Sequence, residues 1–204
     1  KELDPPIKHL FVWNSDIANC TPDSSNVRDG LKRKDLFTVV HDTFWTDSCM
    51  YADVVLPADT QLEHTDLHAP YGHYYFSLTQ QAIKPLGESK SNQDLFRELA
   101  KHMGYKEKCF KESDESMIKN MIDPKHNPLF KGVTYEKLKK NGWVKGDVNN
   151  PRRNYLKTGW PTKDKKIQIY SEDTKKIGLG AYPSYTEEFK KSEIKKKYPI
   201  QILS

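Results

Sequence analysis

The sequence predicts an α/β fold: a Rossmann-like parallel sheet with flanking helices, followed by a helical and irregular extension with a short strand. Three short apolar runs, at residues 9–13, 36–40 and 52–57, are separated by segments that suit helical crossovers. Most runs of Val, Leu and Ile lie before Gly104, and Lys dominates after it. This alternation of strands and helices is typical of parallel sheets with right-handed crossovers. We therefore expect a sheet domain over residues 1–105 and an extension over residues 106–204.

The first predicted strand, residues 9–13, is an apolar run that ends in the polar loop Asn14-Ser15-Asp16. Such a run, closed by turn residues, indicates a buried strand. A modest helix is expected over residues 27–34, where Gly30 lowers the helical propensity. This helix would return the chain to the start of the second strand.

The second predicted strand, residues 36–40, is closed by His41-Asp42. A short helical crossover over residues 46–51 leads to the third strand, which Pro57 ends. Polar residues therefore follow the carboxyl ends of the first two strands. In open α/β sheets this edge is where ligands bind.

The clearest helix is predicted from Ser91 to His102. Ser91 followed by Asp94 resembles a capping box, with Asp in place of the usual Glu, and Gly104 can terminate the helix. The apolar face is expected to consist of Leu95, Phe96, Leu99 and Met103. Further expected segments are helices over residues 113–122 and 134–140, an irregular stretch over 143–161, an exposed strand over 166–170 and an apolar strand over 198–203.

Charge and cysteine content restrict the function classes. The net charge is +5, and the excess lies mostly in the last third, in lysine runs at residues 190–191 and 195–197. Acidic residues interleave with these runs, which favours a solvated surface over a nucleic-acid interface. The three cysteines form no Cys-x-x-Cys pair, so neither an iron–sulfur cluster nor a structural zinc site is indicated. We expect no membrane segment and a cytoplasmic location, with the periplasm left open.

The stretch from Phe37 to Ala58 resembles the molybdopterin oxidoreductase family, the dimethyl sulfoxide reductase superfamily. That family shows an apolar strand, an acidic residue at its end, then Thr, then Ala-Asp-Val-Val-Leu-Pro, which stands here at residues 52–57. Other stretches are similar to the family as well: Glu63, residues 84–88, 94–104, 134–143 and 160–171. The chain thus resembles a piece of the large catalytic subunit, corresponding to its third domain.

The resemblance implies a bis(molybdopterin guanine dinucleotide) cofactor with Mo or W, one arm of which this domain would help to bind. A 4Fe-4S cluster is possible in the parent enzyme but not in this chain, and the protein ligand of the metal would also lie elsewhere. The isolated chain is therefore expected to be inactive, whereas the intact parent would be an oxidoreductase. The implied partners are the remaining domains of the same subunit, including a C-terminal dinucleotide-binding domain, and possible electron-transfer subunits. We expect no nucleic-acid partner, and dimerisation through exposed interdomain surface is open.

The candidate cofactor-binding residues follow the first two strands. Asn14 and Ser15 suit phosphate or ribose oxygens, although an ordinary Asx turn would explain them too. Asp42 can accept hydrogen bonds from a ribose diol or from the guanine N1/N2 edge, or it can be a solvated loop carboxylate. His41 can contact the ligand through its backbone or ring. Thr46 can donate to phosphate or serve as a plain helix cap.

Three further acidic or imidazole residues lie outside the loops that follow the first two strands. By resemblance Asp94 is a guanine contact, whereas the local sequence makes it a helix-capping residue. His64 stands where relatives often carry Lys, and its imidazole would donate to a phosphate or base in a pH-dependent way. Asp53, a family marker, is expected to bond neighbouring backbone N–H groups. Lys163-Asp164-Lys165 replaces a small Ser-Gly of the family, which puts a close backbone approach there in doubt.

Two alternatives remain open from the sequence. His64 and His68, four residues apart, could share a metal on a helix, but Pro70 and Gly72 favour a loop there. The chain could also be a stand-alone basic α/β module that binds nucleotides or nucleic acid without enzyme activity.

Overall fold

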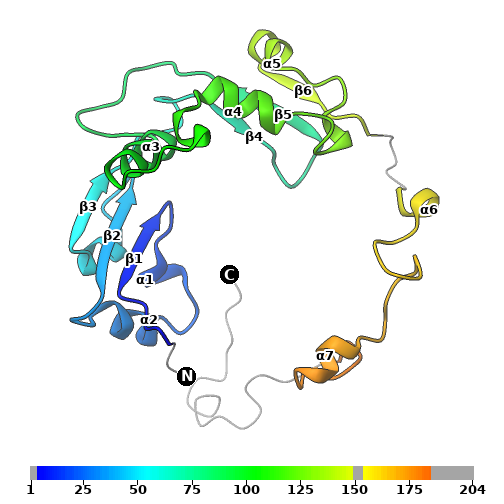
Figure 1. The fold of residues 1–204 in the computed structure, drawn as a ribbon, viewed down its shortest axis with the longest axis horizontal. Helices are drawn as coiled ribbons and strands as arrows, with labels where there is room; N and C mark the ends of the chain where they lie inside the picture. The colour runs from blue at the N-terminus through cyan, green and yellow to red at the C-terminus, as the bar shows by residue number, and fades with distance from the viewer. Residues whose placement is uncertain (1–3, 149–153, 185–204) are drawn as a thin grey trace. The chain divides into compact units, whose positions relative to one another are not determined.

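The computed structural model describes residues 4–148 and 154–184, drawn as coloured ribbon in Figure 1. The chain divides into two compact units, Lys1–Val148 and Asn149–Ser204. The domain boundary expected after residue 105 stays a prediction. The strand expected over residues 198–203 and the lysine runs between 190 and 197 lie outside the described residues.

The first unit contains a parallel three-stranded sheet in the order β1-β2-β3 (Figure 1). Its strands are β1 (His9–Trp13), β2 (Phe37–Asp42) and β3 (Val54–Pro57). The pairing runs in register, with Trp13 opposite His41 and Asp42 opposite Pro57. The predicted α/β fold with a parallel sheet is thereby confirmed. The central strand β2 is buried from its second to its fifth residue, as expected for a strand covered on both faces.

The crossover after β1 contains α1 (Ile17–Cys20) and α2 (Ser24–Leu31). The helix expected over residues 27–34 is thus shifted toward the N-terminus. Asp23 adopts a left-handed conformation (φ 58°) directly before α2, so the helix starts at the pair of serines that follows it. The crossover after β2 is the 3₁₀ helix η1 (Asp47–Tyr51), which confirms a short helical segment there.

Two carboxylates fix these crossovers to the sheet. Asp16 accepts hydrogen bonds from Ser48 through its backbone N–H (3.0 Å) and its hydroxyl (2.6 Å), and Ser48 Oγ accepts the N–H of Ala18 (3.1 Å). Asp53 accepts the N–H of Thr38 at 2.7 Å, at the beginning of the β2–β3 pair. The structural role expected for Asp53 is therefore seen directly.

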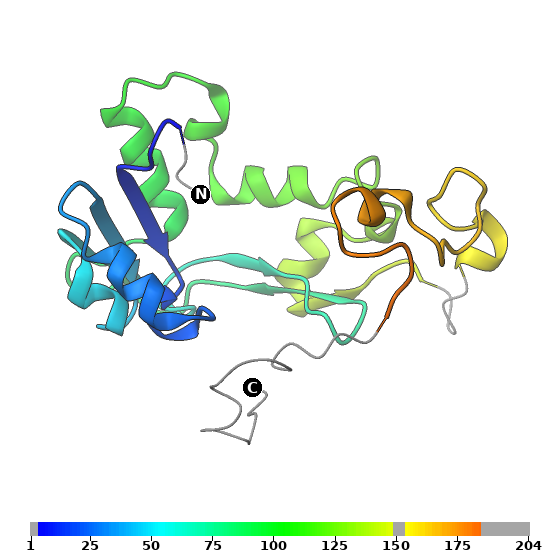
Figure 2. The same cartoon turned by 90° about the horizontal axis from the view of Figure 1, so that it is seen from below.

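The first unit also contains an antiparallel sheet that the sequence analysis missed. It consists of β4 (Asp66–His68), β5 (Tyr75–Thr79) and β6 (Trp143–Lys145), in that order (Figure 2). The loop expected around Pro70 and Gly72 is present between β4 and β5, whereas the chain expected to be irregular from residue 143 begins with β6. These strands are only three to five residues long, and β6 pairs with a strand far away in the sequence, so no local pattern reveals them.

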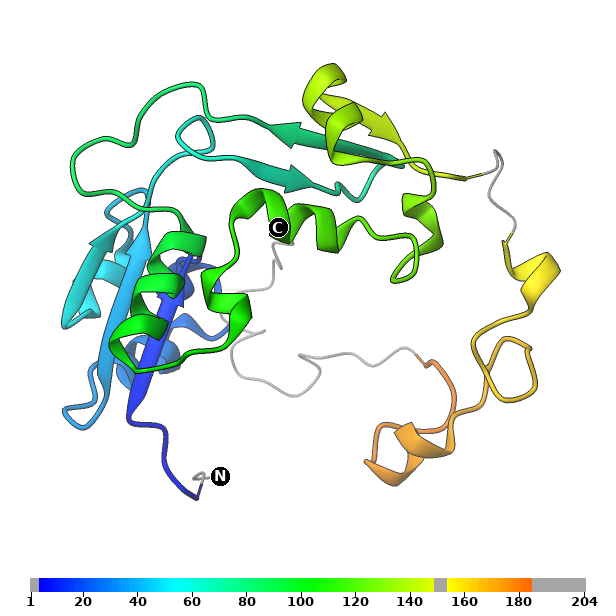
Figure 3. The same cartoon turned by 45° about the horizontal axis from the view of Figure 1, so that its top comes forward.

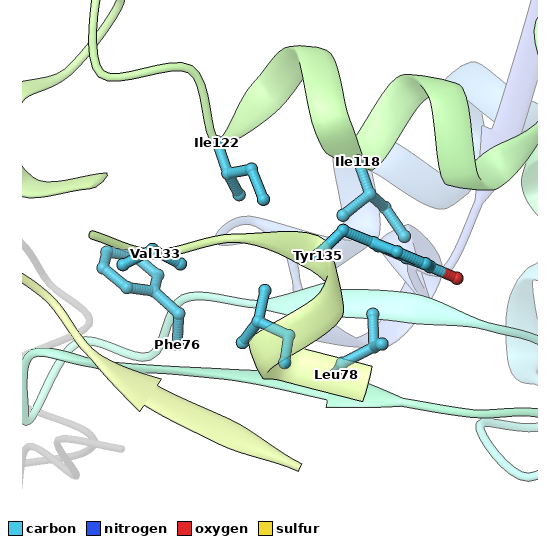
Figure 4. Packing of buried hydrophobic residues seen from close by; sticks show 7 residues of the cluster. Phe76, Leu78, Ile118, Ile122, Val133 and Tyr135 are labelled. Atoms are coloured by element: carbon cyan, nitrogen blue, oxygen red, sulfur yellow. The ribbon is translucent and has the colours of Figure 1, made fainter. Parts of the chain in front are cut away.

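The main hydrophobic core lies between this sheet and two helices, α4 (Asp114–Met121) and α5 (Tyr135–Asn141). Figure 4 shows Ile118 of α4 and Ile122, which directly follows α4, directed toward Phe76 and Leu78 of β5. Leu138 of α5 is completely buried in the same cluster. Both helices begin close to the expected positions, after the cap residues Ser113 and Thr134, whose side chains accept backbone N–H groups.

Helix α3 (Asn92–His102) lies beside β1 (Figure 3). Its Phe96 ring lies 5.7 Å from the ring of Phe11 and 5.3 Å from that of Trp13. The expected apolar face is only partly correct, because Leu99 and Met103 are 37% and 60% exposed. The helix instead buries Ala100, which lies one turn after Phe96 on the same side.

The caps of α3 agree with the sequence. Ser91 Oγ accepts the N–H of Asp94 at 3.1 Å. At the other end Gly104 adopts a left-handed conformation (φ 81°), and the N–H of Tyr105 bonds to the carbonyl of Ala100. Short helical turns follow at η2 (Lys108–Lys111) and η3 (Pro128–Phe130).

The second unit contains two short helices, α6 (Asn154–Thr158) and α7 (Glu172–Lys176). Residues 166–170 do not form the expected strand. Ile167 and Ile169 are 61% and 68% exposed, so their alternating pattern is not stabilised by burial on either face. Among all described residues, no helix is both long and apolar enough to cross a bilayer.

The segment between β3 and α3, which includes β4 and β5, is held by one buried carboxylate that joins the loop before β4 to the loop after β5. Glu63, 6% exposed, accepts the N–H of Thr60 with Oε2 (2.6 Å) and the N–H of Leu86 with Oε1 (2.7 Å). The hydrogen bond from the Thr60 backbone is the main cause that lowers the pKa of Glu63 below its ordinary value, because it stabilises the charged form. Glu63 thus ties two distant parts of this segment together.

Truncating the core side chain Leu138 is expected to destabilise the first unit. Leu138→Ala should lower the free energy of unfolding by about 2–5 kcal/mol, because it removes buried contacts and leaves a cavity. Leu86→Ala is the matched control: Leu86 is 83% exposed, and the same deletion should cost below about 0.5 kcal/mol. Urea unfolding followed by circular dichroism measures both, and equal losses would contradict the assignment of the core.

Acid should weaken the hydrogen bonds by which Glu63 holds the backbone of Thr60 and Leu86. Because the folded pKa of Glu63 is lowered, its stabilising contribution is complete above the unfolded value of about 4.3 and is lost as the pH falls through the folded pKa. Glu63→Gln should lower the Tm at neutral pH. In this variant the Tm should also fall less than that of the wild type when the pH drops below about 4.3. Glu88→Gln, at an exposed position of the same segment, should follow the wild-type acid profile. Parallel wild-type and Glu63→Gln profiles would contradict this role of Glu63.

Candidate functional site

A cavity of about 420 Å³ lies where the three parallel strands end. Asn14 directly follows β1, Thr43 follows the end of β2, and Ala58 to Thr60 follow β3. Carboxyl ends of parallel strands meet at one edge of a sheet, which is where α/β proteins bind ligands. The cavity is lined by Asn14, Thr43, Phe44, Ala58, Asp59, Thr60, Gln61, His64, Asp66, Asn92 and Gln93.

Backbone pairing brings the start of α3 to this edge. The N–H of Asp59 bonds to the carbonyl of Lys90 (3.1 Å), and the N–H of Lys90 bonds to the carbonyl of Pro57 (3.2 Å). The two hydrogen bonds form an isolated parallel bridge between Ala58, which directly follows β3, and Lys90. As a result Asn92, the first residue of α3, lies among residues that follow strand ends.

A buried acid and a histidine form a hydrogen-bonded pair at the cavity. Asp59 Oδ1 lies 2.9 Å from His64 Nδ1, and the side chains are 4% and 22% exposed. Burial raises the pKa of the Asp59 carboxyl above its ordinary value, and the charge and hydrogen bond of His64 oppose that shift. His64 therefore compensates a carboxylate that the surrounding chain desolvates.

Three of the predicted site residues belong to this edge. Asn14 and His64 line the cavity. Asn14 adopts a left-handed conformation (φ 51°), which Asn tolerates, and its N–H bonds to the carbonyl of His41 at 3.2 Å. His41 is buried beside the cavity wall, and its Nδ1 lies 3.2 Å from Oδ1 of the lining residue Asn92.

The other four predicted residues do not line the cavity. Asp42 accepts the N–H of Phe44 at 3.3 Å within its turn, and Ser15 is exposed. Thr46 precedes η1 without a side-chain cap hydrogen bond, and its hydroxyl lies 3.5 Å from Cys49 Sγ. Asp94 pairs with Arg97 at 2.9 Å on the exposed side of α3. Ser91 provides the cap, so the Asp94 side chain does not have the capping role considered for it, and its guanine contact stays a prediction.

Most residues that line the cavity were not predicted from the sequence. Asp59 and Gln61 follow the third strand, so the rule applied to the first two strands would have found them. Asp66 and Asn92 carry no such signal, since they reach the cavity through the bridge at Lys90 and the fold of the antiparallel sheet.

The histidines considered as metal ligands have other partners. His64 pairs with Asp59, and His68 Nε2 lies 2.7 Å from Thr79 Oγ1. Within residues 4–148 and 154–184, no group of three or more His, Cys, Asp or Glu residues is arranged to hold a metal ion.

A second cavity, of about 480 Å³, lies at the C-terminal end of α3. Lys101, Tyr105 and Phe110 contribute to its lining, together with Arg97, whose guanidinium is hydrogen-bonded to Asp114. None of its lining residues follows a strand of the parallel sheet. The first cavity is therefore the candidate functional site.

Comparison with known proteins shows which family the chain resembles. A sequence model of the molybdopterin oxidoreductase family matches residues 3–102. The "Probable oxidoreductase YoaE" of Bacillus subtilis (strain 168) is 42% identical over 185 residues, which cover 91% of this chain and 27% of that protein. The dimethyl sulfoxide/trimethylamine N-oxide reductase of Rhodobacter capsulatus is 28% identical over 185 residues, covering 80% of this chain and 22% of that protein.

A solved structure agrees with these matches. Acetylene hydratase from Pelobacter acetylenicus aligns with a TM-score of 0.72 and 26% identity, over 96% of this chain and 26% of that chain. The chain thus spans about a quarter of the length of the relatives that it matches. The similarity first indicated by residues 37–58 extends over nearly the whole chain, and the protein belongs to the molybdopterin oxidoreductase family, the dimethyl sulfoxide reductase superfamily.

Proposed function

We propose that this chain forms part of a bis(molybdopterin guanine dinucleotide) site, and that the cavity at the strand ends takes the guanosine end of one cofactor arm. The observation that carries this proposal is the position of the cavity, at the carboxyl ends of β1, β2 and β3. Its volume of about 420 Å³ also lies in the range of ligand sites.

The side chains of the lining fit a guanine base better than a phosphate. Asp59 and Asp66 place two carboxylates in the cavity, and these accept hydrogen bonds of the kind offered by guanine N1–H and N2–H₂. The same carboxylates repel phosphate oxygens. The diphosphate is therefore placed outside the cavity, toward the loops that follow β1 and β2.

Those loops contain the remaining predicted contacts. The hydroxyls of Ser15 and Thr46 and the amide of Asn14 offer donors for phosphate or ribose oxygens. Asp42 offers a carboxylate for the ribose diol. Their contacts with the cofactor, like those of His41, His64 and Asp94, stay predictions.

The relatives also support a proposal for the activity of the complete protein. When bound, the cofactor supplies the molybdenum or tungsten centre for redox or oxygen-atom transfer. The residues of this chain bind and orient one arm, and the isolated chain has no turnover. Relatives that include a formate dehydrogenase and a trimethylamine-N-oxide reductase fit a role in anaerobic respiration. Other domains of the same subunit would complete the site, and a cytoplasmic location is part of the proposal.

Removing the charge of Asp66 should weaken guanine nucleotide binding. GMP titrated into the 204-residue chain should bind about 10–100-fold more weakly to Asp66→Asn, the loss expected when a charge-assisted hydrogen bond disappears. The amide keeps an oxygen for the N–H of Leu67, which Asp66 Oδ1 accepts at 2.7 Å, so the fold is preserved.

Asp35→Asn is the matched control for this titration, because Asp35 lies before β2, at the opposite end of that strand. Its GMP affinity should equal that of the wild type, measured by calorimetry at fixed salt. Equal losses in both variants would contradict a site at the strand ends. Tight, strongly salt-dependent binding of DNA or RNA would favour the basic nucleic-acid module instead.

A further inference from the structure

The cavity at the C-terminal end of α3 has no part in the proposed function. It forms where the chain turns back after the helix. The N–H of Tyr105 bonds to the carbonyl of Ala100 at 2.9 Å, and the Tyr105 ring lies 5.7 Å from the ring of Phe110 in η2. Phe110 is half-buried and Tyr105 is 49% exposed. With a volume of about 480 Å³, the cavity leaves room for a bulky side chain beside these rings.

The lining combines an apolar floor with a cationic rim. Tyr105 and Phe110 provide the two rings of the floor. The rim carries the exposed lysines Lys101, Lys106 and Lys111. Lysine side chains of this kind cover apolar surface with their aliphatic stems and keep the ammonium group in water. The cavity therefore offers apolar surface inside and positive charge around its mouth.

The three rim lysines make no ion pair within the part of the chain that the structure describes. Two acidic residues of the same segment have other partners. Glu107 accepts the backbone N–H of Lys106 at 2.9 Å, and Glu112 accepts the side-chain amide of Asn120 at 3.1 Å. Neither carboxylate lines the cavity. The positive charge of the rim is thus left uncompensated.

The other charged lining residues are already paired. Glu98 lies 2.6 Å from Lys90, and the Arg97 guanidinium is hydrogen-bonded to Asp94 at 2.9 Å and to Asp114. These pairs hold the helical wall of the cavity in place. They also leave the rim lysines as the charges that an incoming group would meet.

Helix electrostatics account for only one of the rim lysines. Lys101 lies in the last turn of α3, where the helix dipole favours a cation. Lys106 and Lys111 lie beyond the end of the helix, where this effect has fallen off. Their position beside an apolar floor is complementary to a group that is both apolar and surrounded by negative charge.

We propose that this cavity is a docking site for a separate, acidic protein, which inserts an aromatic side chain flanked by carboxylates. The rings of Tyr105 and Phe110 receive the aromatic side chain, as buried aromatic anchors do at the centres of protein interfaces. The rim lysines face the flanking carboxylates. The inference goes beyond the proposed function and does not depend on it.

Two observations favour a separate protein over another domain of the same subunit. Opposite charges around a docking site mainly speed the encounter of free partners, and a covalently linked domain needs no such steering. The cavity also lies at the far end of α3 from the candidate functional site. The helix has 11 residues, which corresponds to a length of about 16 Å.

A small aromatic anion fits the cavity less well than a protein segment. Small-molecule sites hold a few polar groups in fixed positions. Here the cation that is held in place, Arg97, already binds Asp94 and Asp114, whereas the unpaired cations are on flexible side chains at the rim. A peptide segment can place several carboxylates around one aromatic anchor, which is what three spaced lysines require.

The test is a nitrogen-15 NMR titration of the 204-residue chain with three capped pentapeptides at low salt. The first has one tryptophan between two pairs of glutamates. The second has alanine in place of the tryptophan, and the third has glutamines in place of the glutamates. The first should shift the amide signals of Gly104, Tyr105 and Phe110 and bind about 10-fold more tightly than either of the others, because only it has both the anchor and the charges.

Reversing the charge of the rim should weaken the first peptide. The double variant Lys106→Glu/Lys111→Glu should bind it about 10-fold more weakly, and both side chains are exposed, so the fold is preserved. Lys84→Glu/Lys131→Glu is the matched control, because it changes the net charge equally at exposed lysines outside the cavity. The control should keep the wild-type affinity within about twofold.

Removing one ring should affect the anchor alone. Tyr105→Ala should reduce the preference for the tryptophan peptide over the alanine peptide to about one, because the floor loses half of its aromatic surface. Tyr71→Ala, at a fully exposed tyrosine outside the cavity, should keep the wild-type preference.

Three outcomes would overturn the proposal. Absence of amide shifts around Gly104 with the first peptide would exclude the site. Equal weakening in the two double variants would indicate unspecific attraction to a basic chain. Shifts of the same amides with indole-3-acetate, but with none of the peptides, would assign the cavity to a small aromatic anion instead.

Discussion

The parallel pairing of β1, β2 and β3 is the constraint on which the site depends. Parallel strands point the same way, so the three segments that leave them all emerge at one edge of the sheet. The hydrogen bond from the N–H of Asn14 to the carbonyl of His41 continues this pairing into the first loop. Asn14, Thr43 and Asp59 are separated in sequence by whole crossovers, yet they line one cavity. Any slip in the register would move these side chains relative to one another and change the cavity.

The segment between β3 and α3 completes this edge because a few buried groups hold the loops at its two ends. Glu63 binds two backbone N–H groups that lie far apart along this segment, and the bridge at Lys90 returns the chain to the end of β3. Backbone groups that would otherwise be desolvated without partners are satisfied in this way. The helix α3 consequently begins at a fixed point, which places Asn92 against His41. The site is thus built from sheet pairing and from one segment that Glu63 and this bridge hold.

How much of this could be predicted from the sequence depends on the range of the interactions. The strands of the parallel sheet, the cap at Ser91 and the helices that begin after Ser113 and Thr134 follow from local patterns, and the structure confirms them. The antiparallel sheet depends on the pairing of β5 with β6, which no local pattern encodes. At residues 166–170 the error is in the other direction. The alternation of polar and apolar residues predicted a strand there, but no described segment pairs with these residues.

The candidate site follows the same division. Asn14, His41 and Asp42 were found because they end predicted strands, whereas Asp66 and Asn92 depend on how distant segments return. Asp42 and Asp94 were chosen because a carboxylate can accept hydrogen bonds from a ligand. In the structure their side chains accept hydrogen bonds from Phe44 and Arg97 instead. A sequence can therefore indicate the edge of a sheet that binds a ligand, but tertiary contacts decide which of its polar side chains face the cavity.

The Asp59–His64 pair shows why a polar cavity persists at this edge. Burying a carboxylate is unfavourable, and the raised pKa of Asp59 records that cost. His64 compensates it only in part, because its single contact, at 2.9 Å, is with one of the two carboxylate oxygens. A structural role would be served as well by an apolar pair of similar size, without this desolvation. The arrangement is reasonable where a ligand with N–H groups supplies further donors, which is the property of the guanine edge proposed for this cavity.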